Sequence, residues 1–191
     1  FDPVFATDIT LTQIAQAPKD SNIFYSVMPA ESTLFPDNEF DLITVAQALH
    51  WIRPEDFYRE AVRTGKPNAI LAVWGYGLPK VDPRIDLALD DFYRNRVGPY
   101  WDEARKHVDE AYANIPFPFD RIPTPRFEIK LEWAIDMFAG YLTSWSATQK
   151  YIRSKENDPV AGFVESIGRQ WQANEKKAVI FPLFIKVGRI R

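Results

Sequence analysis

Short apolar runs alternate with helix-like stretches in the first part of the chain, and this alternation constrains the fold more than any other feature. Four runs have the length and the β-branched and aromatic content of buried strands: Val4–Asp8, Asn22–Val27, Phe40–Ala46 and Asn68–Tyr76. Helices are predicted at 11–17 and 54–64, because Pro54 suits a first helical position and Gly65 follows the second helix. Parallel strands joined by helices bind ligands at their carboxyl ends. The sequence therefore predicts an α/β sheet with a site at that edge.

The middle of the chain has a different character. Residues 78–125 contain seven prolines and many aromatic residues, with helices predicted at 83–97 and 100–114. We interpret this segment as a lid over the ligand edge of the sheet, but a peripheral pair of helices that only packs fits the residues equally well. The last third returns to the sheet, with a strand near 126–130, helices to about 172 and a final strand at 177–187.

Composition argues against several classes of protein. The 23 Lys and Arg residues stand against 26 Asp and Glu residues, and this net charge of −3 disfavours a nucleic-acid-binding protein. The lack of cysteine excludes disulfides, zinc ribbons, iron–sulfur clusters and cysteine nucleophiles, and with only two histidines we expect no metal site. No apolar run approaches the roughly 20 residues that cross a bilayer, and no segment has a signal-peptide pattern. We expect a cytoplasmic protein that acts on a small molecule and binds neither nucleic acid nor a membrane; the oligomeric state stays open.

Polar residues follow the predicted strands. Asp8 ends the first strand, Ala30 and Glu31 follow the second, and the third is followed by Gln47, His50 and Trp51. An acid at a strand end can accept both ribose hydroxyls of an adenosine-type ligand, but Asp8 suits the cap of the next helix equally well. Glycine-rich phosphate motifs are missing, because Gly75-Tyr-Gly77 is the one G-x-G and Lys80 takes the place of the third glycine.

One long motif and two flanking stretches point to a family. The run from Ala30 to Trp51 reads A-E-x-x-x-(L/F)-P-D-x-x-F-D-L-(I/V)-x-x-A-Q-A-x-H-W, and Phe5-Ala-Thr-Asp-Ile-Thr10 precedes it. With Gly140-Tyr-Leu-Thr-Ser-Trp-Ser146 and Phe181-Pro-Leu-Phe-Ile-Lys-Val-Gly-Arg189, these residues resemble the class I S-adenosylmethionine-dependent methyltransferases, and within them the group that contains trans-aconitate methyltransferase. The resemblance covers nearly the whole chain. It implies a Rossmann-like methyltransferase fold: a mostly parallel sheet with an antiparallel last strand and a helical lid insertion.

The resemblance also implies roles for individual residues. It assigns Asp8 to the ribose of S-adenosylmethionine, with Ile9 beside it at the cofactor, and places Ala30 and Glu31 along the adenine. Gln47, His50 and Trp51 would lie under the methionine part and open on the substrate. The implied organisation is a cofactor-binding part at 1–77, incomplete at its N-terminal side, a lid at 78–125 and the C-terminal part of the α/β domain at 126–191.

Methyl transfer from a sulfonium depends on alignment in a dry pocket more than on acid–base groups. Aromatic faces hold cations, and we assign substrate contacts to Trp51, Tyr76 and Trp145, although aromatic residues near a sheet edge are as readily explained as core. His50 is the candidate acceptor of a proton from an oxygen nucleophile, or else a satisfied histidine at a helix end.

The implied function is methyl transfer to a small-molecule acceptor, with a carboxylate as a candidate. Two other functions stay open at this point. One is a non-catalytic, methyltransferase-like module that binds a partner or metabolite. The other is a nicotinamide-dependent oxidoreductase, which the lack of G-x-G-x-x-G and of a Tyr-x-x-x-Lys pair disfavours.

The family's first strand and its glycine-rich loop have no counterpart in the chain, which opens at Phe1. Because that strand lies at the centre of the family's sheet, we expect the strands ending at Asp8 and Ala46 to lie roughly 9.6 Å apart without pairing. Unpaired inner edges are unfavourable, so we expect either residues before Phe1 in the natural protein, or another chain or a rearranged segment in the slot. Since the missing loop holds the methionine end of the cofactor, we expect the chain as given to bind no S-adenosylmethionine and to be inactive by itself.

Overall fold

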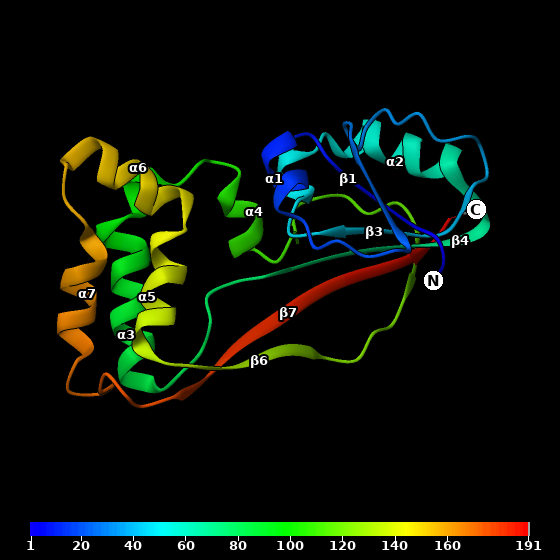
Figure 1. Cartoon of the computed structure of the whole chain (residues 1–191). Helices are drawn as coiled ribbons and strands as arrows, with labels where there is room; N and C mark the ends of the chain where they lie inside the picture. The colour runs from blue at the N-terminus through cyan, green and yellow to red at the C-terminus, as the bar shows by residue number, and fades with distance from the viewer. Residues whose placement is uncertain (191) are drawn as a thin grey trace. The chain divides into compact units, whose positions relative to one another are not determined.

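A computed structural model describes residues 1–190. The chain begins with a strand–helix–strand unit, in which β1 (Val4–Asp8) and β2 (Ile23–Val27) are joined by α1 (Leu11–Gln16) (Figure 1). The two strands pair in parallel, with Val4 opposite Ile23 and Asp8 opposite Val27. This confirms the first two predicted strands and the helix between them.

The second sheet contains the other five strands of the described residues. Its strand order is β3 (Phe40–Ala46), β4 (Gly65–Tyr76), β7 (Lys177–Arg189) and β5 (Asp120–Ile122), and β6 (Phe127–Trp133) also pairs with β7. Strand β3 is parallel to β4, whereas β5 and β6 are both antiparallel to β7. The predicted α/β fold with an antiparallel last strand is therefore confirmed.

Strands β1 and β3 belong to different sheets in the described part of the chain. Aromatic side chains connect the two sheets instead of a backbone ladder, because the ring of Phe5 on β1 lies 5.9 Å from that of Phe40 on β3 and 5.4 Å from that of Phe35. The prediction that the strands ending at Asp8 and Ala46 do not pair is confirmed.

Six further helices follow the sequence signals with local exceptions. They are α2 (Pro54–Thr64), α3 (Pro83–Asp91), α4 (Arg105–Asp109), α5 (Ile135–Thr143), α6 (Ser146–Lys155) and α7 (Pro159–Ile167). Proline occupies the first turn of α2, α3 and α7, and the side chains of Asp82 and Asp158 accept backbone N–H groups at the starts of α3 and α7. Phe57, Tyr58, Ala61 and Thr64 form the buried stripe of α2.

Of the two helices predicted in the middle of the chain, the first is confirmed over 83–96 and the second is wrong. The first is an α-helix to Asp91 and continues as a π-helical turn over Phe92–Arg96, in which the Val97 N–H donates to the Phe92 carbonyl. The second, predicted at 100–114, contains only a 3₁₀ turn at Gly98–Tyr100 and the short α4. Ala111 and Tyr112 have φ angles of 51° and 58°, which a right-handed helix cannot include.

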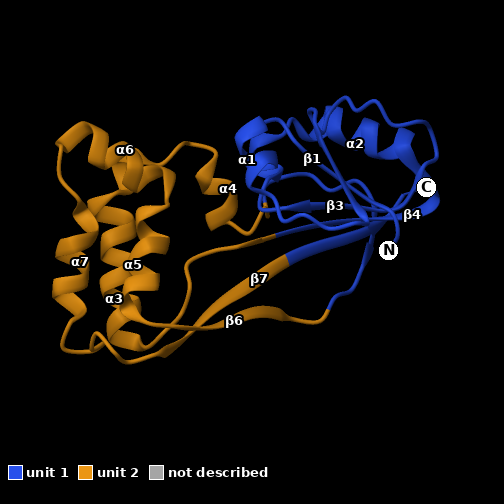
Figure 2. Cartoon of the chain, viewed as in Figure 1, with its two compact units in different colours: residues 1–74, 114–124, 185–191 blue, residues 75–113, 125–184 orange. Residues whose placement is uncertain are grey.

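The chain forms two compact units (Figure 2). Unit 1 comprises residues 1–74, 114–124 and 185–190, and unit 2 comprises 75–113 and 125–184. In unit 1 the buried apolar residues come mainly from α2 and β4, and include Phe57, Ala61, Leu71 and Val73. In unit 2 a single large core joins α3, α5, α6, α7 and β7, with Phe138 and Trp171 among its fully buried side chains. The role of 78–125 as a lid is not tested by this division and stays a prediction.

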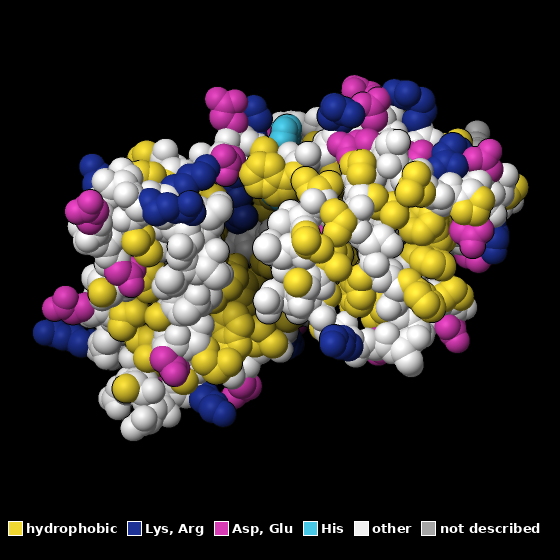
Figure 3. Space-filling model, turned by 45° about the horizontal axis from the view of Figure 1, so that its top comes forward, with side chains coloured by type: hydrophobic (Ala, Val, Ile, Leu, Met, Phe, Trp, Pro, Cys, Tyr) yellow, Lys and Arg dark blue, Asp and Glu magenta, His cyan; other side chains and the backbone are white. Residues whose placement is uncertain are grey.

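Hydrophobic side chains gather on the surface of unit 1, on the face that Figure 3 turns toward the viewer. The large apolar residues that are exposed in unit 1 are Phe1, Phe5, Ile9, Leu11, Phe24, Val27, Leu34, Trp51 and Val62. Within residues 1–190, every helix is too short or too polar to cross a membrane.

Candidate active site

Asp8 lies at the carboxyl end of β1 and is half-buried. Its Oδ1 atom accepts the backbone N–H of Thr10 at 2.7 Å, and its backbone carbonyl accepts the N–H of Met28 at 3.1 Å. The hydroxyl of Thr10 makes no capping bond to α1. Asp8 therefore fixes the turn into α1 with one carboxylate oxygen, while Oδ2 accepts no hydrogen bond from the described residues.

Glu31 connects the loops that follow β2 and β3. Its Oε1 atom accepts the backbone N–H of Arg53 at 3.1 Å, immediately before α2 begins at Pro54. The guanidinium of Arg53 turns to Asp56 instead, with Nε 2.6 Å from Oδ2. Because Met28, just before this loop, is bonded to Asp8, the carboxyl ends of β1, β2 and β3 lie at one edge of unit 1.

An ion pair on α2 holds the loop between β2 and β3. Glu60, whose side chain is 11% exposed, accepts the backbone N–H of Thr33 at 2.8 Å, the Thr33 hydroxyl at 2.5 Å and Arg63 Nη2 at 2.6 Å. These bonds, above all that from Arg63, lower the pKa of Glu60 to about 2. Arg63 also donates to the Phe35 carbonyl and to Asp37, so the side chains of Glu60 and Arg63 together hold most of the A-E-x-x-x-(L/F)-P-D segment in place.

Only part of this arrangement is visible in the sequence. The spacing of Glu60 and Arg63, three residues apart on a predicted helix, indicates an ion pair. That spacing does not indicate the contact with a loop more than twenty residues earlier in the chain, which exists only in the folded protein.

The residues after β3 form a tight turn. Gln47 has a φ angle of 52°, a left-handed conformation that is uncommon outside glycine, and its backbone N–H donates to the Trp74 carbonyl at 2.8 Å. Such backbone conformations concentrate at functional sites. His50 and Trp51 follow in a 3₁₀ turn, with their ring centroids 4.9 Å apart, and the Trp51 side chain is 59% exposed.

The predicted site residues divide between the two units. Unit 1 brings together those at the carboxyl ends of β1, β2 and β3: Asp8, Ile9, Ala30, Glu31, Gln47, His50 and Trp51. Tyr76 and Trp145 belong to unit 2, where the Tyr76 ring packs 5.4 Å from that of Phe181. Trp145 is 8% exposed and packs among aromatic rings, which agrees with the alternative that this residue belongs to the core. The substrate contacts of Tyr76 and Trp145 stay predictions.

The charged run at 103–110 is partly buried. The pattern around His107 favours a solvated helical face, but Val108 is buried, the Nδ1 atom of His107 is buried, and the side chain of Arg105 is only 18% exposed. Among residues 1–190, no three His, Asp or Glu side chains lie close enough together to hold a metal ion.

Known proteins resemble the chain in sequence and fold. A family model described as a methyltransferase domain matches residues 2–73. A provisionally named methyltransferase of Dictyostelium discoideum is 29% identical over 192 aligned positions, which cover 97% of this chain and 73% of that protein.

Two solved structures extend the comparison. A provisionally described type II methyltransferase from Anaeromyxobacter dehalogenans is 36% identical, with a TM-score of 0.91, over 100% of this chain and 81% of that one. A provisionally described methyltransferase from an antibiotic biosynthesis pathway of Anabaena variabilis shares the fold, at 9% identity and a TM-score of 0.50, over 94% and 81% of the two chains. The chain belongs to the S-adenosylmethionine-dependent methyltransferase family.

Proposed function

We propose that the protein transfers a methyl group from S-adenosylmethionine to a small-molecule acceptor, with a carboxylate as the first candidate. The observation that carries the proposal is the carboxyl edge of β1, β2 and β3. There Asp8 is linked to Met28, and Glu31 is linked to Arg53. In parallel α/β sheets this edge is where nucleotide ligands bind.

The side chains at this edge fit parts of the cofactor. Asp8 has a carboxylate oxygen without a hydrogen bond from the described residues, and a ribose hydroxyl requires such an acceptor. Glu31 uses Oε1 for Arg53 and leaves Oε2 for a polar contact with the adenosine. The exposed ring of Trp51 offers a π face to a cation.

When bound, S-adenosylmethionine supplies an electrophilic methyl group attached to a sulfonium. The chain's own residues then have limited tasks. Gln47 and Trp51 position the methionine part and the acceptor, and His50 accepts the proton of an oxygen nucleophile where the acceptor carries one. Tyr76 and Trp145 are the further substrate contacts of this proposal.

Calorimetric titration of the natural protein with S-adenosylmethionine and S-adenosylhomocysteine tests the proposal. A hydrogen bond to a charged group contributes about 1.5–3 kcal/mol, so Asp8→Asn should weaken both ligands roughly tenfold to a hundredfold. Asp20→Asn is the matched control, because Asp20 Oδ1 also accepts the N–H two residues later, that of Asn22, but lies in a turn and ends no strand. Equal affinities for wild type and Asp8→Asn would remove the ribose role of Asp8, and absence of binding to wild type would remove the proposed function.

A further inference from the structure

Unit 2 contains an open pocket of about 480 Å³ that none of the predicted site residues lines. Its walls come from one continuous stretch of chain, the π turn at 92–96, the 3₁₀ turn at 98–100 and α4. Among its lining residues are Tyr93, Arg94, Trp101, Asp102, Arg105 and Asp109.

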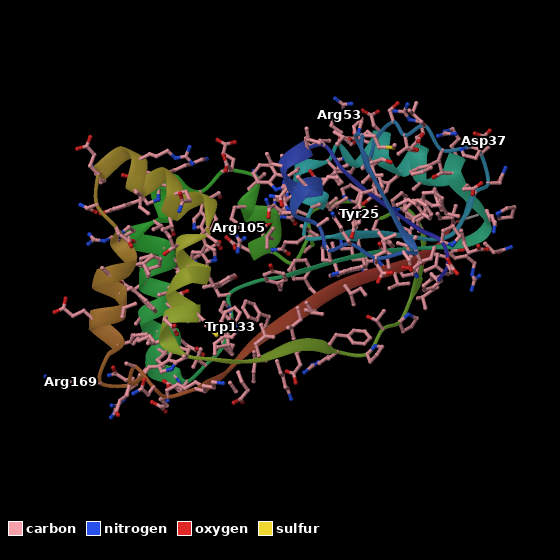
Figure 4. The ribbon with its side chains drawn as sticks, viewed as in Figure 1. Tyr25, Asp37, Arg53, Arg105, Trp133 and Arg169 are labelled. Atoms are coloured by element: carbon pink, nitrogen blue, oxygen red, sulfur yellow. The ribbon has the colours of Figure 1, made fainter. Side chains whose placement is uncertain are left out.

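Arg105 is held against aromatic rings in this pocket (Figure 4). Its guanidinium carbon lies 4.7 Å from the ring centroid of Trp101 and 5.5 Å from that of Tyr93. Both distances are within the range of cation–π interactions, which strengthen as the cation is desolvated. A stacked guanidinium is fixed in orientation and cannot turn freely to a new partner.

The polar contacts of Arg105 use only one of its nitrogens. Nε donates to the Tyr93 hydroxyl at 2.9 Å and lies 3.6 Å from Asp109 Oδ1. Nη1 and Nη2 donate to no acceptor in the described residues. Arginine normally binds a carboxylate through two parallel N–H groups. In Arg105 the N–H groups of Nη1 and Nη2 are unused.

The Tyr93 hydroxyl and Asp109 Oδ1 both lie on the Nε side of the Arg105 guanidinium. The Tyr93 hydroxyl donates to Asp109 Oδ1 at 2.6 Å, and burial raises the pKa of Tyr93 well above its usual range, so the hydroxyl stays a donor. Two other charged residues of the pocket have partners: Arg94 pairs with Asp90, and Asp102 pairs with Lys150 at 2.6 Å. Glu103 and Lys106, of opposite charge, also line the pocket.

We propose that this pocket binds a small organic acid, with the acid's carboxylate on Nη1 and Nη2 of Arg105 and its apolar body near Trp101 and Tyr93. A carboxylate matches the planar fork and carries a single charge. The nearby carboxylates of Asp102 and Asp109 disfavour a doubly charged phosphate, because like charges at short range repel. Binding of the acid to this pocket does not depend on the function proposed above.

The test uses ligand-observed NMR on the natural protein with three probes. Benzoate should bind, benzamide, which has the same shape without the charge, should bind at least tenfold more weakly, and inorganic phosphate should not compete. Arg105→Gln should lower benzoate affinity tenfold or more. Arg105→Lys, which keeps the charge but loses the fork, should lower it by a similar factor. Arg94→Gln is the matched control, since Arg94 lines the same pocket with its charge already paired.

The folded state of each variant is checked by its thermal unfolding curve, and the lysine variant serves if the glutamine variant is unfolded. Equal binding of benzoate and benzamide, equal losses in Arg94→Gln and Arg105→Gln, or displacement of benzoate by phosphate would each overturn the proposal. If benzoate fails to bind while S-adenosylmethionine binds, the pocket assignment is wrong and the proposed function stands. If benzoate binds and S-adenosylmethionine does not, the reverse holds.

Discussion

The carboxylate of Glu31 accepts the backbone N–H of Arg53 at 3.1 Å, and this bond joins the loop after β2 to the start of α2. The first helical N–H groups have no partner within their helix, so an acid at this position also suits the positive end of α2. The 3₁₀ turn that contains His50 and Trp51 ends two residues before Arg53, so the contact lies next to it in the chain.

Replacement of Glu31 should weaken the connection between the loop after β2 and the start of α2. In Glu31→Ala the Arg53 amide loses its acceptor and should exchange its hydrogen roughly fivefold to tenfold faster, in line with a net hydrogen bond of about 1 kcal/mol. Glu31→Gln keeps an acceptor oxygen and should exchange nearly as wild type. Amide hydrogen exchange followed by NMR measures both, and equal rates in wild type and the alanine variant would contradict the assigned bond.

The Glu60–Arg63 pair should make stability depend on acid pH. Because folding lowers the pKa of Glu60 to about 2, its contribution is complete above its unfolded pKa of roughly 4.3 and disappears as the pH falls toward 2. Glu60→Gln should destabilise the protein by about 1.5–3 kcal/mol at pH 7. The same variant should lose less of its free energy of unfolding than wild type between pH 5 and 2. Urea unfolding across this range is the measurement. Glu55→Gln, an exposed residue of the same helix, is the control, and an unchanged pH slope in Glu60→Gln would refute the account.

Substitution by alanine should change the stability of the protein in opposite directions at two glycines. A Cβ atom on Gly188 would lie 2.6 Å from Phe119 Cβ and 2.7 Å from a ring atom of Phe117, so Gly188→Ala should cost about 1–3 kcal/mol of stability. A Cβ on Gly162 in α7 would meet nothing within 4 Å, and Gly162→Ala should stabilise by roughly 0.5–1 kcal/mol. Chemical unfolding of both variants measures these changes. A higher stability of Gly188→Ala or a lower stability of Gly162→Ala would contradict the packing.

His50 should affect turnover more than cofactor binding. If it accepts a proton from an oxygen nucleophile, His50→Gln should lower kcat by about 10²–10⁴-fold, the usual contribution of such a group. The affinity for S-adenosylhomocysteine should stay within a few-fold of wild type. An unchanged kcat would leave His50 as a positioning residue of the 3₁₀ turn.

Elements with a strong local signal could be predicted from the sequence. The bounds of β1 and β3 agree with the prediction, because each is a short apolar run between polar residues, and α2 begins at its proline and ends before Gly65. The grouping of Asp8, Glu31 and Trp51 also follows from strand order, since parallel strands place their carboxyl ends at one edge.

Features that depend on distant parts of the chain could not be predicted. The contact of Glu60 with Thr33 exists only once separate segments meet. Pro182 indicates an edge strand or a bulge by propensity, yet it lies within β7, which has neighbours on both sides, and is paired in register with Glu128. Tertiary pairing overrode the local preference there.

The central claim is that the carboxyl edge of β1, β2 and β3 holds the adenosine of the cofactor, with Asp8 on its ribose. A crystal structure of the natural protein with S-adenosylhomocysteine tests this most directly. We predict ribose hydroxyl oxygens within hydrogen-bond distance of the Asp8 carboxylate and the adenine beside Ala30 and Glu31. A cofactor bound elsewhere, or a ribose that makes no contact with Asp8, would contradict the account.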